Sequence, residues 1–127
     1  LCTEVEGRLL GELTAPFLFG ETFLGERPGV VDDIVRSTKP SEASRAFMQA
    51  QVRALQAFDG SSLCSAVACP TLCMAGEEDT LTLPRDVMDT ATRIPGAVYR
   101  GVARAGHSLM LESKDAVDLV ADFARDR

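Results

Sequence analysis

Two segments of the sequence carry side chains suited to acid–base chemistry, and each follows a predicted strand. Asp79 comes shortly after a predicted strand over residues 71–75. His107 comes shortly after a second predicted strand over residues 97–102. In open α/β sheets, functional side chains gather at the carboxyl ends of the strands. A carboxylate placed there accepts a hydrogen bond from the imidazole Nδ1–H, which leaves Nε2 free to act as a base. The pattern therefore predicts an acid–base pair at one edge of a sheet.

Each of these side chains also has an ordinary structural explanation. His107 is the only histidine of the chain, and a lone histidine is more often structural than catalytic. An aspartate in a glycine-containing acidic loop is usually a solvated turn residue or a helix cap, and we expect Glu77 and Glu78 to be solvated loop charges. Ser108 is a poor candidate nucleophile, because adjacent side chains rarely face each other productively. Only the joint placement of Asp79 and His107 favours catalysis.

The elements of the second half, from about residue 61 to 127, alternate between strand and helix. The first predicted strand is followed by a helix that begins at Pro84, a favourable first helical residue. A last helix follows the second strand and Ser113. We expect its buried face to hold Val117, Val120, Ala121 and Ala124. This order of elements predicts parallel strands joined by a crossover helix.

The first half, to about Phe58, is predicted to be helical. An apolar face at helical spacing is expected from Val5, Leu9, Leu10 and Leu13. Pro16 is expected to interrupt this first helix. A helix over residues 41–58 is expected to be the longest of the chain. Its apolar residues are spread so broadly around it that we expect cover on more than one side.

Two parallel strands are too few for an independent sheet, because parallel sheets need several strands with both faces covered. The second half should therefore extend a sheet that other residues build, and nothing before Phe58 has the pattern of a strand. The chain also begins at Leu1, without an initiator methionine. We expect either a processed start or a segment of a longer polypeptide.

Composition narrows the class of protein. The 127 residues are 46% apolar and 25% charged, with a net charge of −6, as is typical of one globular domain. No window is apolar enough for a membrane span, and the acidic balance argues against nucleic-acid binding. The spacing of Cys64, Cys69 and Cys73 matches no common zinc pattern. We expect packing cysteines and a reducing, cytoplasmic compartment.

From about Phe58 to Phe123, the sequence resembles the C-terminal part of an α/β-hydrolase. The residues that carry this resemblance are Phe58, Asp59, Leu63, Val67, 70–72, 76–79, Pro84, 94–97, 105–107 and Glu112. In that family, the aspartate and the histidine in these contexts are the acid and the base of a Ser-His-Asp triad. The resemblance therefore implies these roles for Asp79 and His107.

The resemblance also implies an α/β fold that is incomplete on its own. Residues 1–60 resemble the helical cap segment of the esterase, lactonase and non-haem haloperoxidase branch. Residues 61–127 resemble the C-terminal βαβα part of the hydrolase core, with the last two parallel strands and their flanking helices.

The chain departs from the family pattern at two points. Lys114 stands where the family often has a proline, which affects only a helix start. The G-x-S-x-G nucleophile elbow is missing, since residues 60–62 lack the second glycine and a preceding strand. Because the family order is nucleophile, acid, base, the resemblance places the nucleophile and the oxyanion loop before Leu1. They would belong to the N-terminal half of the same enzyme or to a second chain.

The implied activity is hydrolysis of a carboxylic ester, lactone or thioester by a serine supplied from outside this chain. An aspartate at the elbow would instead indicate a dehalogenase or an epoxide hydrolase, and C–C cleavage and perhydrolysis stay open. No metal or organic cofactor is implied. The chain alone is expected to be inactive.

We expect a small apolar acyl substrate, because the cap is apolar and carries no cluster of Arg or Lys. The candidate pocket residues are Phe17, Phe19, Phe23, Phe47 and Met48, although aromatic residues often simply pack. The alternative function is a non-catalytic, hydrolase-like module that binds a ligand or a partner. A homo-oligomer stays open.

Overall fold

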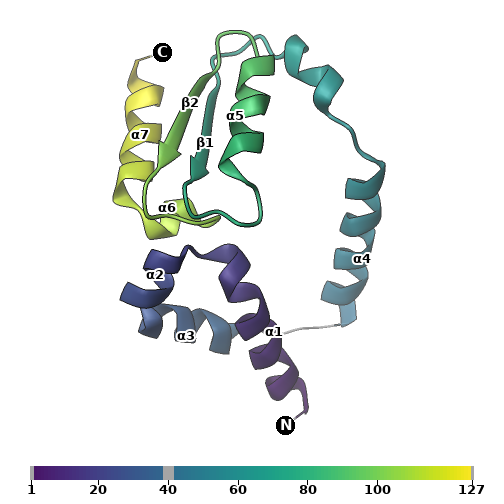
Figure 1. Cartoon of the computed structure of the whole chain (residues 1–127). Helices are drawn as coiled ribbons and strands as arrows, with labels where there is room; N and C mark the ends of the chain where they lie inside the picture. The colour runs from purple at the N-terminus through teal and green to yellow at the C-terminus, as the bar shows by residue number, and fades with distance from the viewer. Residues whose placement is uncertain (1, 39–41, 127) are drawn as a thin grey trace.

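The computed structural model describes the backbone of residues 2–38 and 42–126 and the side chains of residues 7–38 and 46–126. A helical N-terminal part is joined through one long helix to a C-terminal part that holds both strands (Figure 1). In chain order the elements are α1 (Cys2–Leu18), α2 (Glu21–Glu26), α3 (Pro28–Ser37), α4 (Glu42–Ala57), the 3₁₀ helix η1 (Ser61–Ala66), β1 (Leu72–Gly76), α5 (Pro84–Arg93), β2 (Val98–Val102), α6 (Leu109–Glu112) and α7 (Lys114–Arg125). The predicted order of helices, then strand, helix, strand and helix, is confirmed.

β1 and β2 form a two-stranded parallel sheet, as predicted, with Leu72 paired to Val98 and Gly76 paired to Val102. The crossover helix α5 packs against both strands, and α7 lies beside β2 (Figure 1). A small core forms where Val102 meets the buried Ala116 of α7. Because the strands are parallel and in register, both end at the same edge of the sheet. The segments that follow them are therefore neighbours.

The N-terminal part is held together by small residues on α1. The buried positions on α1 are Gly7, Gly11 and Ala15, which recur every four residues on one face. A Cβ at Gly11 would lie 3.0 Å from the Cα of Val35 on α3, so the two helices approach closely there.

The predicted apolar face of α1 is wrong, because the close packing of α1 on α3 selects the small residues. Leu9 and Leu13 are 54% and 61% exposed, and Leu10 is half-buried. The side chain of Val5 lies outside the described residues.

Pro16 lies inside α1 and does not interrupt it. Proline removes one N–H donor from a helix. The helical hydrogen-bond pattern nevertheless continues past Pro16, since the N–H of Phe19 donates to the carbonyl of Ala15 at 2.9 Å. The helix ends at Leu18.

α4 departs most from the sequence-based expectation. The predicted helix exists, although its start at residue 41 lies outside the described residues, and with 16 residues it is one shorter than α1. Helix α4 lies apart from the other helices in Figure 1, and every side chain described on it is exposed. The expected cover on more than one side is therefore absent within the described part of the chain. Phe47 and Leu55 are 65% and 72% exposed.

α7 buries a different face from the predicted one. Ala116 is fully buried and Leu119 packs beside it, whereas Val117 and Val120 are 45% and 40% exposed. The buried face is set by contact with the end of β2, so it begins one residue earlier than the expected face.

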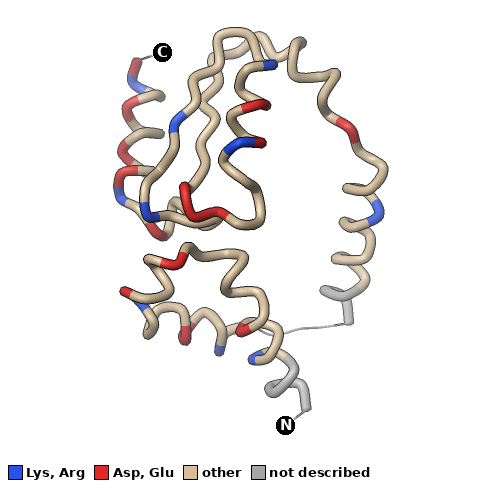
Figure 2. The backbone as a smooth tube through the Cα atoms, viewed as in Figure 1, with Lys and Arg blue, Asp and Glu red and all other residues tan. Residues whose placement is uncertain are grey.

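Charge is distributed unevenly over the surface. Acidic residues recur along α7 and gather in the segment after β1, at the edge where both strands end (Figure 2). In the described residues, no helix combines the length and the apolar character that a membrane crossing requires.

Candidate active site

Asp79 lies in the turn after β1 and is 5% exposed. Its Oδ1 accepts hydrogen bonds from the backbone N–H groups of Leu81 and Thr82, at 2.8 and 2.9 Å. Its Oδ2 lies 3.0 Å from Nδ1 of His107. The two oxygens of Asp79 thus contact different groups, because Oδ1 binds the backbone of its own turn and Oδ2 faces the imidazole. Such a buried carboxylate is stable only with these partners.

His107 lies in the segment after β2, and its side chain is 39% exposed. A carboxylate oxygen can only accept a hydrogen bond, so Nδ1 of the imidazole carries the proton in this contact. The lone pair of the neutral ring is then on Nε2, the nitrogen that can take a proton from a nucleophile. The structure therefore brings together the two residues that the sequence singled out, and their contact favours the tautomer that general-base chemistry requires.

The contact of Asp79 with His107 depends on a close approach of the two loops. The N–H of Glu78 donates to the carbonyl of Ala105 at 2.9 Å. A Cβ on Gly76 would lie 2.2 Å from the carbonyl oxygen of Ala105 and 2.3 Å from that of Gly106. Such contacts do not occur in proteins, so glycine at position 76 lets the second loop cross directly over the end of β1.

The N-terminal helices dock on both loops. Thr22 of α2 donates from its backbone N–H and its hydroxyl to the carboxylate of Glu78, at 2.8 and 2.5 Å. These hydrogen bonds hold the pKa of Glu78 below its ordinary value. On the other loop, the N–H of Ser108 donates to the carbonyl of Leu18 at 2.8 Å. The expectation that Glu78 is a solvated loop charge is therefore wrong, because α2 supplies donors for its carboxylate.

Glu112 makes a further link between the same segments. Its Oε2 accepts hydrogen bonds from the N–H groups of Gly20 and Gly106, both at 2.8 Å. The sequence includes Glu112 among the residues that carry the family resemblance, but it indicates no role for this residue. Its partner Gly20 is 92 positions away, and no sequence pattern indicates such a contact.

An apolar groove of about 640 Å³ lies beside His107. Among its lining residues are Leu72 and Met74 of β1 and Leu111 of α6. The imidazole thus sits at the boundary between the polar loops and an apolar surface, which is the usual setting of a site for a partly apolar ligand.

The five aromatic and methionine residues expected to line a substrate pocket are not brought together. Phe19 is 4% exposed and stacks on Phe23 with ring centroids 5.3 Å apart, so both belong to the core of the helical part. Phe17, Phe47 and Met48 are about half exposed or more, the last two of them on the separate helix α4.

The cysteines of the second half form no disulfide with one another: Cys64, Cys69 and Cys73 are free. Cys69 is exposed, which contradicts the packing role expected of it, whereas the other two are half-buried. Within the described residues, His, Cys, Asp and Glu do not gather in a group of three or more that could hold a metal ion.

Comparison with known proteins identifies the fold. No protein-family model matches the sequence, and no curated protein matches it significantly. Among solved structures, a malate-bound thermophilic esterase from Thermogutta terrifontis is similar with a TM-score of 0.79 and 22% identity, over 98% of this chain and 48% of the other. The enol-lactonase from Burkholderia xenovorans LB400 is similar with a TM-score of 0.79 and 22% identity, over 94% of this chain and 45% of the other.

A third similar structure carries the family name itself. It is an α/β hydrolase from a Medee basin deep-sea metagenome library, with a TM-score of 0.66 and 19% identity, over 96% of this chain and 46% of the other. The chain thus spans about half the length of the solved structures that it matches. Similarity at this level of identity concerns the fold, and the fold of this chain is part of an α/β-hydrolase fold.

Proposed function

We propose that this chain is the C-terminal half of a serine α/β-hydrolase that cleaves a carboxylic ester or a lactone. The observation that carries the proposal is the hydrogen bond of 3.0 Å between His107 Nδ1 and the buried carboxylate of Asp79, at the carboxyl ends of two parallel strands. The substrate class is supported by the names of two similar structures, an esterase and an enol-lactonase.

In the proposed mechanism, His107 is the general base and Asp79 is the acid that orients it. Nε2 of His107 takes the proton of a serine hydroxyl as the serine oxygen attacks the substrate carbonyl, and it returns that proton to the departing alkoxide. A water molecule then attacks the acyl-enzyme with the same assistance and releases the carboxylic acid. Asp79 holds the imidazole in the correct tautomer and stabilises its charged form. The serine and the oxyanion-hole donors belong to the N-terminal half.

The exposed surface of the chain supports the proposal of a second half. The accessible surface is 8964 Å², whereas a compact monomer of 13.6 kDa exposes roughly 6,600 Å². Large apolar side chains contribute to this excess on α1, α4 and α7. Contiguous exposed apolar surface marks a face that a partner covers. We propose that the N-terminal half covers the groove beside His107 and places the nucleophile there.

The test is an ester-hydrolysis assay of the complete protein, encoded by the full reading frame, with a short-chain p-nitrophenyl ester. The wild-type protein should hydrolyse the ester, and His107→Ala should lower kcat by about 10³-fold or more, since both the proton acceptor and the proton donor are lost. Circular dichroism should report an unchanged fold, because the His107 side chain is partly exposed.

Arg100→Ala is the matched control, since Arg100 is an exposed residue on β2, the strand that precedes His107. It should retain kcat within about twofold, as expected for a surface substitution. Turnover that survives His107→Ala would exclude the proposed base. A folded complete protein that hydrolyses neither esters nor lactones would support a non-catalytic binding module.

A further inference from the structure

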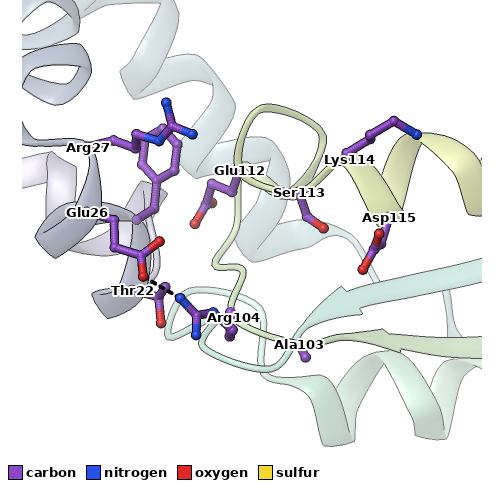
Figure 3. A pocket seen from close by; sticks show the side chains of 10 residues that line it. Thr22, Glu26, Arg27, Ala103, Arg104, Glu112, Ser113, Lys114 and Asp115 are labelled. Carbon is purple, nitrogen blue, oxygen red and sulfur yellow. Dashed lines mark hydrogen bonds and ion pairs between the residues drawn. The ribbon is translucent and has the colours of Figure 1, made fainter.

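Glu112 joins two backbone segments that are far apart in the sequence. One carboxylate oxygen, Oε2, accepts hydrogen bonds from the N–H of Gly20 at the start of α2 and from the N–H of Gly106 beside His107. The other oxygen, Oε1, is buried and has no hydrogen-bond partner within the described part of the chain. Figure 3 shows the side chain between Glu26 and Arg27 on one side and Ser113 on the other. Glu112 thus lies where the helical part meets the segment after β2.

The two segments approach so closely that their amides need a common acceptor. A Cβ on Gly106 would lie 2.2 Å from the nitrogen of Gly20, and a Cβ on Gly20 would lie 2.8 Å from the nitrogen of Gly106. The N–H groups of Gly20 and Gly106 cannot form a hydrogen bond with each other, because neither can act as an acceptor. A carboxylate oxygen placed between them satisfies both, and the bonds are charge-assisted. The two glycines, at positions 20 and 106, therefore allow the close approach, and the carboxylate of Glu112 satisfies both of the amides that this approach brings together.

The segment before His107 also needs external support. Arg104 has a φ of +58°, a left-handed conformation that residues with a side chain adopt only under constraint from their surroundings. Ala105, next to it, is fully buried. The strained Arg104 and the Gly106 amide that Glu112 binds lie on either side of Ala105, directly before His107. The position of the imidazole is therefore set by the backbone from Arg104 to Gly106.

We propose that Glu112 is a positioning residue for the base: by binding Gly20 and Gly106 together, it fixes His107 over Asp79 and joins the helical part to the same point. This inference rests on the proposed function, because it assigns Glu112 to that reaction. A displacement of a reacting group by about 1 Å can lower a rate by about 10²-fold. Loss of the carboxylate should therefore reduce kcat, while KM changes little if the substrate contacts are made elsewhere.

The test compares Glu112→Ala, Glu112→Gln and the control Glu77→Gln in the complete protein. Glu77 is a second carboxylate near the site, and it is exposed. We expect Glu112→Ala to lower kcat by about 10- to 100-fold with KM within about threefold. Glu112→Gln keeps one acceptor oxygen and should lose only about two- to fivefold. Glu77→Gln should match the wild type.

A second measurement does not depend on activity. Hydrogen exchange of the backbone amides of Gly20 and Gly106, followed by NMR, should be about tenfold faster in Glu112→Ala and faster to a smaller extent in Glu112→Gln. Amides elsewhere in β1 and β2 should exchange as in the wild type, which separates a local effect from general destabilisation. Unchanged exchange at Gly106, or unchanged kcat in Glu112→Ala, would overturn the inference.

The outcomes separate this inference from the proposed function. If the wild-type protein is inactive or if His107→Ala keeps its turnover, the proposed function fails, and with it the role of Glu112 in catalysis. If His107→Ala is inactive while Glu112→Ala keeps full kcat, only the inference fails. Should Glu112→Ala not fold, Glu112→Gln decides: exchange at Gly106 and kcat that both equal the wild-type values would overturn the inference.

Discussion

At the scale of single residues, the candidate site depends on how one carboxylate divides its oxygens. Asp79 uses Oδ1 for the N–H groups of Leu81 and Thr82, and Oδ2 for His107. The structural and the functional explanation of this aspartate are therefore compatible, since the residue caps its own turn and also contacts the imidazole. Because Oδ2 of Asp79 faces the imidazole, replacing this acceptor oxygen with a donor group would change the tautomer of His107.

Asp79→Asn provides the test at this scale. An asparagine can keep an acceptor oxygen toward the turn, but it then presents an NH₂ group to His107 Nδ1. The imidazole must accept at Nδ1, so Nε2 carries the proton and cannot act as a base. We expect kcat of the complete protein to fall by about 10²- to 10⁴-fold, with the melting temperature nearly unchanged. Asp86→Asn, at an exposed position on α5, is the control, and an Asp79→Asn enzyme with normal kcat would contradict the assigned tautomer.

At the scale of elements, helix α2 is hydrogen-bonded to both segments of the candidate site, the loop after β1 and the segment after β2. The loop after β1 contributes Glu78, whose carboxylate accepts from Thr22. The segment after β2 contributes Glu112, which accepts from Gly20. The first N–H groups of a helix have no partner within the helix, and here two acidic side chains of the strand-bearing part supply the acceptors. Docking of α2 and placement of the site loops are therefore coupled.

The lowered pKa of Glu78 leads to a pH-dependent prediction for this docking. Because hydrogen bonds from Thr22 hold the pKa of Glu78 below its ordinary value of 4.5, the ionised form is favoured in the folded state. Its stabilising contribution is complete above about pH 4.5 and is lost as the pH falls through the folded-state pKa. At pH 7, Glu78→Gln should lower the free energy of unfolding by about 1 kcal/mol.

Urea unfolding of the complete protein between pH 3 and pH 8 measures this effect. The difference between the wild type and Glu78→Gln should be constant above about pH 5 and should shrink below pH 4.5. Glu21→Gln is the control, because Glu21 is an exposed acid in the first turn of the same helix. A difference that grows as the pH falls would be the opposite of what the Thr22 contact requires.

At the scale of the whole molecule, the chain exposes more surface than a compact protein of its mass. Its accessible surface of 8964 Å² exceeds the roughly 6,600 Å² expected for 13.6 kDa by about a third. The excess includes the exposed helix α4, which lies apart from the other helices in Figure 1, and the apolar groove beside His107. A two-stranded sheet is also too small to be stable without further strands.

We therefore predict that the 127-residue chain alone has no esterase activity and that the complete protein has it. The isolated chain should bind an apolar dye or self-associate, since its apolar surface is uncovered. Coexpression with the N-terminal half should restore turnover and reduce dye binding, and the same experiment with His107→Ala should reduce dye binding without restoring turnover. Ester hydrolysis by the purified chain alone would contradict the assignment of the nucleophile to another segment.

Much of the local structure was predictable from the sequence because it depends on neighbouring residues. The strands around residues 72–76 and 98–102 and the helix beginning at Pro84 follow from apolar runs and from proline placement. Parallel pairing follows from the order of these elements. The expectation that Asp79 and His107 would be neighbours needed only one further rule, that parallel strands end at the same edge.

The buried faces of the helices and the contacts between distant segments could not be predicted from local patterns. The buried stripe of α1 consists of Gly7, Gly11 and Ala15 rather than of leucines, because α3 approaches closely enough to exclude larger residues. Glu112 accepts a hydrogen bond from the amide of Gly20, which is 92 positions away. Periodicity reports which residues share a face, but the partner that covers a face or accepts a hydrogen bond is set by packing between elements. The elements and the proximity of Asp79 to His107 therefore followed from local sequence patterns, whereas packing between elements determined how α2, Glu78 and Glu112 contact the loops that carry these two residues.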